Sequence, residues 1–201
     1  MYLHADIHGA PSCSLRSTQG FVIDQHRPAH IPDYIPAFKI VDKLGDERIN
    51  DDKLLEAATL ALCWSRAWAS GGGHGTVYSV KPAQVSKTAQ SGEYVGKGAF
   101  IVRGQRQWFK DLDVKMGIGL VSINGVPLLM GGTPERIKEL CQRFAIISPG
   151  LTKKDRLANR IYKNTGLMTD DILSILPGAS EIIEDNGIFS PVKAKKIDEE
   201  E

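Results

Sequence analysis

Three side chains near the start of the chain could bind a metal ion. His4, Asp6 and His8 alternate at a period of two, so on a strand all three would lie on one face. An ion held there could activate water for hydrolysis. We prefer a simpler interpretation, in which the histidines form hydrogen bonds at a strand end, because no Cys, Glu or further His follows at metal-site spacing. We therefore expect no metal and no other cofactor, and we keep a metal-dependent hydrolase using these three residues as an alternative function.

A basic segment in the middle of the chain is the second candidate for chemistry. Residues 78–110 hold six Lys and Arg residues and one acid, Glu93, which gives a local charge of +5 where the whole chain has a formal net charge of +1. Such cations bind phosphate oxygens, and Gln or Ser can contact a base edge or the nucleic-acid backbone. The alternative is that the lysines only keep a loop soluble. The nucleic-acid-binding residues that we predict are Lys81, Gln84, Ser86, Lys87, Lys97, Arg103 and Arg106.

The glycine-rich runs do not fit a phosphate-binding loop. Residues 71–73 end a predicted helix and precede a strand, whereas phosphate loops run from strand through loop to helix. Lys97 is followed by neither Ser nor Thr, and no helix comes after it. Nucleotide hydrolysis has no support in these motifs, and we expect the chain not to be an enzyme.

Hydrophobic periodicity and turn signals predict the elements that position these residues. Asn50 should cap one helix that runs to about residue 69, with Trp64 and Trp68 in the core. Asn124-Gly125 predicts a hairpin that extends the sheet. The predicted strands are 2–7, 76–81, 98–103, 117–123, 126–130 and 144–147, and the remaining helices are 133–143, 153–164 and 169–176, followed by a frayed tail after residue 184.

The helix predicted after Thr152 provides a second basic cluster. Thr152 should cap it, Leu157, Ala158 and Ile161 should face inward, and its cations should face outward. A charged outer face is often only solvated, but next to the first cluster it favours contact with an RNA backbone. This secondary basic patch consists of Lys153, Lys154, Arg156 and Arg160.

Three ordered stretches resemble successive blocks of one domain, namely HADIHGAPS, LLEAATLALCWSRAW and QVSKTAQSGEYVGKGAFIVRG. They are similar to the NFACT-R domain (DUF814) of the ribosome-associated quality-control factors once labelled fibronectin-binding-protein-like, in the archaeal and eukaryotic branch. The resemblance covers residues 2 to about 130. The matching motif positions are His4, Asp6, His8, Gly9, Glu93, Tyr94, Gly98 and Gly104, and the resemblance makes none of them catalytic.

The resemblance implies an RNA-binding module that contacts tRNA on the large ribosomal subunit, where a tail is added to the stalled peptide. It covers only the C-terminal portion of such factors, so the remaining NFACT domains, in the same or a separate chain, are further expected partners. Whether the chain is a fragment or a naturally short protein stays open. A docking domain for ribosomal or partner proteins, using the insert around Tyr34 and Phe38, is another alternative.

Composition and patterning predict an α+β protein with a mixed sheet flanked by helices and a small helical C-terminal extension. We expect an NFACT-R-like domain over 1–132, with its N-terminal strand region missing and a proline-rich insert at about 21–38, then an extension over 133–185 and a flexible acidic tail over 186–201. Three widely spaced cysteines and the lack of any signal peptide or long apolar run favour a soluble cytoplasmic protein with no membrane contact.

Overall fold

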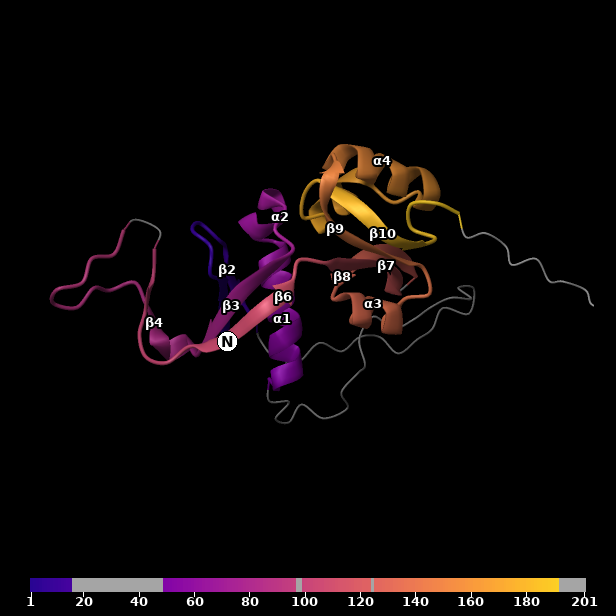
Figure 1. The fold of residues 1–201 in the computed structure, drawn as a ribbon. Coiled ribbons are helices and arrows are strands. Elements are labelled where there is room, and N and C mark those ends of the chain that lie inside the picture. Colours follow the sequence, from indigo (N-terminus) through magenta and orange to yellow (C-terminus); the bar gives the residue numbers. More distant parts are fainter. Residues whose placement is uncertain (16–48, 97–98, 124, 192–201) are drawn as a thin grey trace, which may run out of the picture. The chain divides into compact units, whose positions relative to one another are not determined.

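The computed structural model describes residues 1–15, 49–96, 99–123 and 125–191 (Figure 1). The proline-rich insert, Lys97, Gly98 and the end of the acidic tail therefore lie outside the described residues. The described chain divides into two compact units, with the boundary between Lys115 and Met116. The domain boundary expected at residue 132 stays a prediction.

The first unit is an antiparallel sheet covered on one face by a helix. Its strand order is β2-β1-β3-β6, and α1 contacts β1, β3 and β6. Alternate apolar residues of the strands, such as Leu3, Ala5 and Val77, are buried, and so are Leu54 and Leu62 of α1, which packs on these strands. The elements are β1 (Tyr2–Ala5), β2 (Ser12–Ser14), α1 (Asp51–Cys63), α2 (Arg66–Ser70), β3 (His74–Val80) and β6 (Gln107–Asp113).

The helix expected from Asn50 to residue 69 is two helices. Asn50 caps α1 as predicted, with its Oδ1 accepting a hydrogen bond from the Lys53 amide at 2.9 Å. Ser65 then starts α2, because its Oγ accepts from the Ala67 amide and donates to the Leu62 carbonyl. Trp68 is buried as expected, but the break leaves Trp64 37% exposed, so its placement in the core was wrong.

The second unit is another antiparallel sheet, of order β10-β9-β7-β8. The predicted hairpin is confirmed, with Ile123 paired to Val126. It belongs to this second sheet, so the expectation that it extends the first one was wrong. Its elements are β7 (Met116–Ile123), β8 (Val126–Gly132), α3 (Pro134–Leu140), β9 (Phe144–Thr152), α4 (Lys154–Thr165), α5 (Thr169–Ile175) and β10 (Ser180–Asn186).

Two local expectations in this unit are corrected. Thr152 ends β9 instead of capping α4, and Lys153 at the cap position makes no side-chain cap hydrogen bond. The chain also stays ordered past residue 184: β10 continues to Asn186, and Phe189 is buried. The Asp185 carboxylate causes this by accepting hydrogen bonds from two following backbone amides, and Arg143 and Asn164 both donate to the Gly187 carbonyl.

The α+β class is confirmed. The sheets are less mixed than expected, since every pairing between named strands is antiparallel and parallel pairing among the described residues is limited to an isolated bridge between Phe144 and Gly187. Alternating strands and helices suggested parallel crossovers. A tight hairpin joins β7 to β8, and the long connection through α4 and α5 between β9 and β10 also returns the chain antiparallel. Within the described residues no helix is both long and apolar enough to span a membrane.

Candidate nucleic-acid interface

The basic segment forms an arm between two strands of the first sheet. We use "the arm" for residues 81–106, which leave β3 and return to β6 (Figure 1). It contains a short 3-10 helix, η1 (Pro82–Gln84), and the two short strands β4 (Val85–Ser86) and β5 (Ile101–Val102). The strands pair antiparallel, which closes the base of the arm and makes the strand predicted at 98–103 shorter than expected.

Gln84 fastens the base of the arm. Its Nε2 donates to the carbonyls of Arg103 at 2.9 Å and Gln105 at 2.7 Å, and its Oε1 accepts from the Lys81 amide at 2.9 Å. Gly104 has a φ of +81° beside this amide, and a Cβ there would lie 3.1 Å from Gln84 Nε2. The side-chain amide of Gln84 therefore forms its hydrogen bonds within the arm. A base edge, the predicted partner of this side chain, would have to compete with these bonds.

Ser86 and Arg103 also bind within the arm. The Ser86 hydroxyl accepts from the Thr88 amide and donates to the Thr88 carbonyl. The Arg103 guanidinium forms two hydrogen bonds with the Glu93 carboxylate and one with the Thr88 carbonyl. The hydrogen bond from Arg103, followed by one from the Gln90 amide, holds the pKa of Glu93 below its usual value, and Glu93 raises the pKa of Arg103. This ion pair links the two sides of the arm and offsets one positive charge.

The remaining predicted cations that the structure describes, Lys81, Lys87 and Arg106, have exposed side chains. Lys81 and Arg106 lie exposed at the two ends of the arm, and the Lys87 ammonium lies 5.2 Å from the centroid of the half-exposed Phe100 ring. Tyr94, a matching motif position, is 90% exposed near the middle of the arm. The structure thus separates the predicted set into residues that shape the arm and residues that present charge to solvent.

Three rings form a row on the first sheet. We name His4, Tyr78 and Trp108 the aromatic row; they occupy adjacent strands β1, β3 and β6 and are register partners. The centroids of His4 and Tyr78 are 5.7 Å apart, and those of Tyr78 and Trp108 are 5.3 Å apart. The Arg106 guanidinium carbon lies 4.6 Å from the Tyr78 centroid and 5.8 Å from the Trp108 centroid.

Sequence reasoning included Arg106 but missed Tyr78 and Trp108 as site residues. The signal was present in the period-two spacing of Arg106, Trp108 and Lys110, which is typical of one strand face. It was overlooked because β6 itself was not predicted. This strand contains a bulge at Asp111, whose φ of 54° interrupts its pairing with β3 and its alternation of buried and exposed residues.

The other N-terminal motif positions do not gather around a metal site. The strand ends at Ala5, so Asp6 and His8 lie in the following turn and are exposed, and Gly9 adopts a φ of +73° there. Among the described residues, no group of three or more His, Cys, Asp or Glu side chains could hold a metal ion. His4 instead contacts Tyr78 in the aromatic row.

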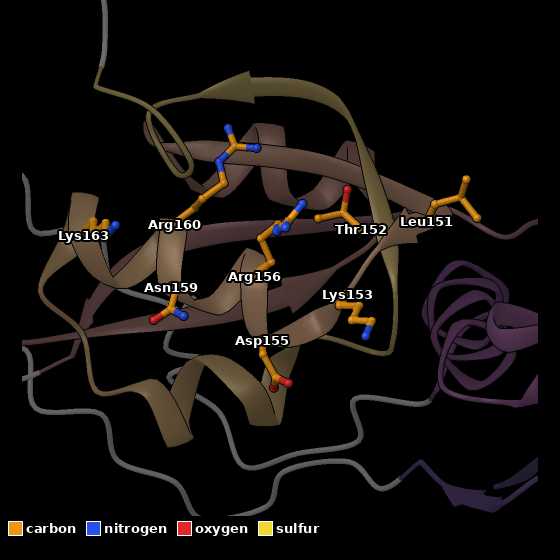
Figure 2. Close-up of a pocket in the computed structure, with 8 residues that line it drawn as sticks. All are labelled: Leu151, Thr152, Lys153, Asp155, Arg156, Asn159, Arg160 and Lys163. Carbon is orange, nitrogen blue, oxygen red and sulfur yellow. The ribbon is translucent and has the colours of Figure 1, made fainter.

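The secondary basic patch borders a cavity in the second unit. The cavity has a volume of about 770 Å³ and is lined by residues at the end of β9 and along α4 (Figure 2). Leu157, Ala158 and Ile161 are buried as predicted, which turns the cations of α4 outward. Arg160 lies over Phe189, with 5.4 Å from the guanidinium carbon to the ring centroid. The lining residues are Leu151, Thr152, Lys153, Asp155, Arg156, Asn159, Arg160 and Lys163.

Comparisons with known proteins agree with the resemblance seen in the three motif blocks. The archaeal Rqc2 homolog aRqcH of Methanocaldococcus jannaschii is 30% identical over 185 residues, which is 90% of this chain and 24% of that protein. The ribosome quality control complex subunit NEMF of Homo sapiens is 31% identical over 121 residues, 60% of this chain and 9% of NEMF. The chain thus spans about a quarter or less of these relatives. No solved structure matches.

A family model also matches about half of the chain. Residues 1–104 match the model described as "NFACT protein RNA binding domain". This stretch includes β1, the helices of the first unit, β3 and all but the last residues of the arm, and it ends just before β6. The description is of a binding domain and names no enzymatic activity. The chain therefore belongs to the NFACT family, through its RNA-binding domain.

Proposed function

We propose that this chain is an RNA-binding module of a ribosome quality-control factor and that it contacts tRNA on the large ribosomal subunit. The observation that carries the proposal is the match of residues 1–104 to the NFACT RNA-binding domain. The names of the NEMF relatives add the quality-control setting. The tRNA ligand follows from the role that the resemblance implies for the whole factor.

The exposed cations of the arm provide the proposed phosphate contacts. Lys81, Lys87 and Arg106 have exposed side chains on a segment whose fold is fixed by Gln84 and by the Arg103–Glu93 pair. An ordered arm loses less conformational entropy on binding than a flexible loop would. Lys97 belongs to the same proposal by sequence, although it lies outside the described residues.

The secondary basic patch is proposed as an additional contact with the RNA backbone. Three of its cations, Lys153, Arg156 and Arg160, line a cavity beside α4, where phosphate groups can approach them from solvent, and Lys154 is not part of this lining. Asp155 in the same lining reduces the local positive charge. We therefore assign the patch a supporting role and the arm the main one.

Fluorescence anisotropy with labelled tRNA at two salt concentrations tests the proposal. Lys81→Gln/Lys87→Gln should weaken binding and make the negative slope of log K against log salt shallower by up to about 1.8, since each phosphate contact with a duplex contributes about 0.9 to its magnitude. Lys115→Gln/Lys138→Gln removes the same charge from other exposed positions and is the matched control.

The outcomes separate cleanly. Loss of affinity in the arm variant and near-normal affinity in the control support the proposal. Failure of the unaltered chain to bind tRNA at low salt would overturn it. Equal loss in both variants would also contradict it, because binding would then follow net charge and not the arm. Lys153→Gln/Arg156→Gln tests the secondary patch separately, with a smaller loss expected.

A further inference from the structure

The aromatic row lies on the sheet face opposite α1. The strand neighbours of its members, such as Leu3 and Val77, are buried on the helix side, and successive side chains of a strand point to opposite faces. His4 and Tyr78 are half-buried, whereas Trp108 is 42% exposed. Trp108 is therefore the most exposed ring of the row, and the other two rings are partly covered.

The row has the dimensions of a stacking surface. Its three rings lie on adjacent strands, and two strand spacings make it about 10 Å wide. The contacts are tilted or edge-on, with interplanar angles of 31° between His4 and Tyr78 and 62° between Tyr78 and Trp108. Because the Trp108 ring is tilted by 62° from the Tyr78 ring, the two rings do not stack face to face. Part of the indole stays exposed to solvent.

Arg106 adds a cation to this surface. It comes directly before β6, two residues before Trp108, and its exposed guanidinium lies over the Tyr78 ring. A guanidinium in this position can stack on a base with its plane and donate hydrogen bonds to a phosphate with its edge. The surface thus combines an aromatic face, for bases, with a positive charge, for the backbone that joins them.

We propose that the aromatic row binds unpaired bases of single-stranded RNA, which stack on Trp108 and on the Arg106 guanidinium. This inference rests on the proposed RNA-binding function and deepens it by naming the ligand class as unpaired nucleotides. Bases inside a duplex have their faces covered by their neighbours, so a duplex can meet only the phosphate-binding cations. Arg106 and Trp108 lie beyond residues 1–104, so the surface is completed by residues outside the family match.

The test measures the affinity of the full chain for three probes of equal strand length: a single-stranded oligoribonucleotide, its abasic counterpart and a duplex. Trp108→Ala should weaken binding of the single strand about fivefold to 150-fold, which is the range for one lost base–aromatic stack. Binding of the abasic strand and the duplex should change little. Trp64→Ala is the matched control, because Trp64 is a similarly exposed tryptophan of the same unit but lies between α1 and α2, away from the row.

A second variant keeps the test independent of any folding defect in Trp108→Ala. Arg106→Lys retains the charge but loses the planar group, so it should weaken the single strand and leave the abasic strand unchanged. Equal effects on the single strand and the abasic strand in both variants would overturn the stacking proposal and leave RNA binding by the arm intact. Failure of the unaltered chain to bind any of the three probes would overturn the proposed function and this inference together.

Discussion

Replacing Gln84 tests whether the arm is ordered by its own hydrogen bonds. Gln84→Ala removes two bonds from Nε2 to carbonyls and one from the Lys81 amide to Oε1, each 2.7–2.9 Å long. A protein hydrogen bond contributes about 0.5–1.5 kcal/mol net, and these lie at a partly exposed site, so we expect a loss of about 2–3 kcal/mol in the free energy of opening the arm.

Amide hydrogen exchange measures this free energy directly. A loss of this size corresponds to about 30- to 150-fold faster exchange, because 1.4 kcal/mol is a factor of ten. The effect should appear at the Lys81 amide, which loses its acceptor, and at the Arg103 amide, which donates to the Gln84 carbonyl at 2.9 Å. Amides in β7 and β9, which belong to the other unit, should exchange at their usual rates.

Gln90→Ala is the matched control for this change. Gln90 is an exposed glutamine of the same arm, and the hydrogen bond to Glu93 comes from its backbone amide and not from its side chain. Its replacement should leave exchange at Lys81 and Arg103 within about twofold of normal, because surface substitutions usually change stability by less than about 0.5 kcal/mol. Unchanged exchange in Gln84→Ala would refute the assignment of Gln84 as the fastener of the arm.

Three further predictions follow from the contacts. NMR titration should place the pKa of Glu93 below its usual value, and Arg103→Gln should raise this pKa. The stabilisation of the arm by the ion pair is therefore complete above the ordinary Glu pKa and is lost as the pH falls through the lowered value. Gly119→Ala should lower the free energy of unfolding by about 1–3 kcal/mol, measured by chemical denaturation, because a Cβ there would lie 2.7 Å from Cys141 Cβ. Burial raises the pKa of the Cys63 thiol to about 12, so its contribution to stability is present below the unfolded value of 9.0 and declines as the pH rises toward 12.

Each of these predictions has a control or a contradicting result. An unchanged Glu93 pKa in Arg103→Gln would contradict the ion pair as the cause of the shift. Gly73→Ala is the control for overpacking, since a Cβ at Gly73 meets nothing within 4 Å. Rapid modification of Cys63 by a thiol reagent in the native protein at about pH 8 would contradict its burial, because only an accessible thiolate reacts.

Sequence patterns predicted the elements whose signals are local. Asn50 as a helix cap, the Asn124-Gly125 hairpin and the inward face of α4 were all predictable, because capping, turns and periodicity act over a few residues. The break at Ser65 was not predicted, because an apolar helical pattern continues across it. The Ser65 hydroxyl ends α1 by hydrogen bonding to the Leu62 carbonyl, a bond that the sequence pattern does not reveal.

The candidate site was predictable in composition but not in roles. Charge and motif located the basic arm in the sequence. The side chains of Gln84, Ser86 and Arg103 nevertheless form hydrogen bonds within the arm, with partners that its turns and strand pairing bring close. The aromatic row required the pairing of β1, β3 and β6, which joins positions as distant as His4 and Trp108. Such register is a property of the folded sheet that no local pattern specifies.

Ultraviolet cross-linking of the full chain to single-stranded RNA containing 4-thiouridine, followed by mass spectrometry of the peptides, tests the central claim most directly. The account predicts that the cross-links concentrate in residues 78–110, at the arm and at Trp108, with fewer on α4. Cross-links confined to α4, or scattered over both units without preference for residues 78–110, would contradict the proposal that the first unit holds the main RNA-binding surface.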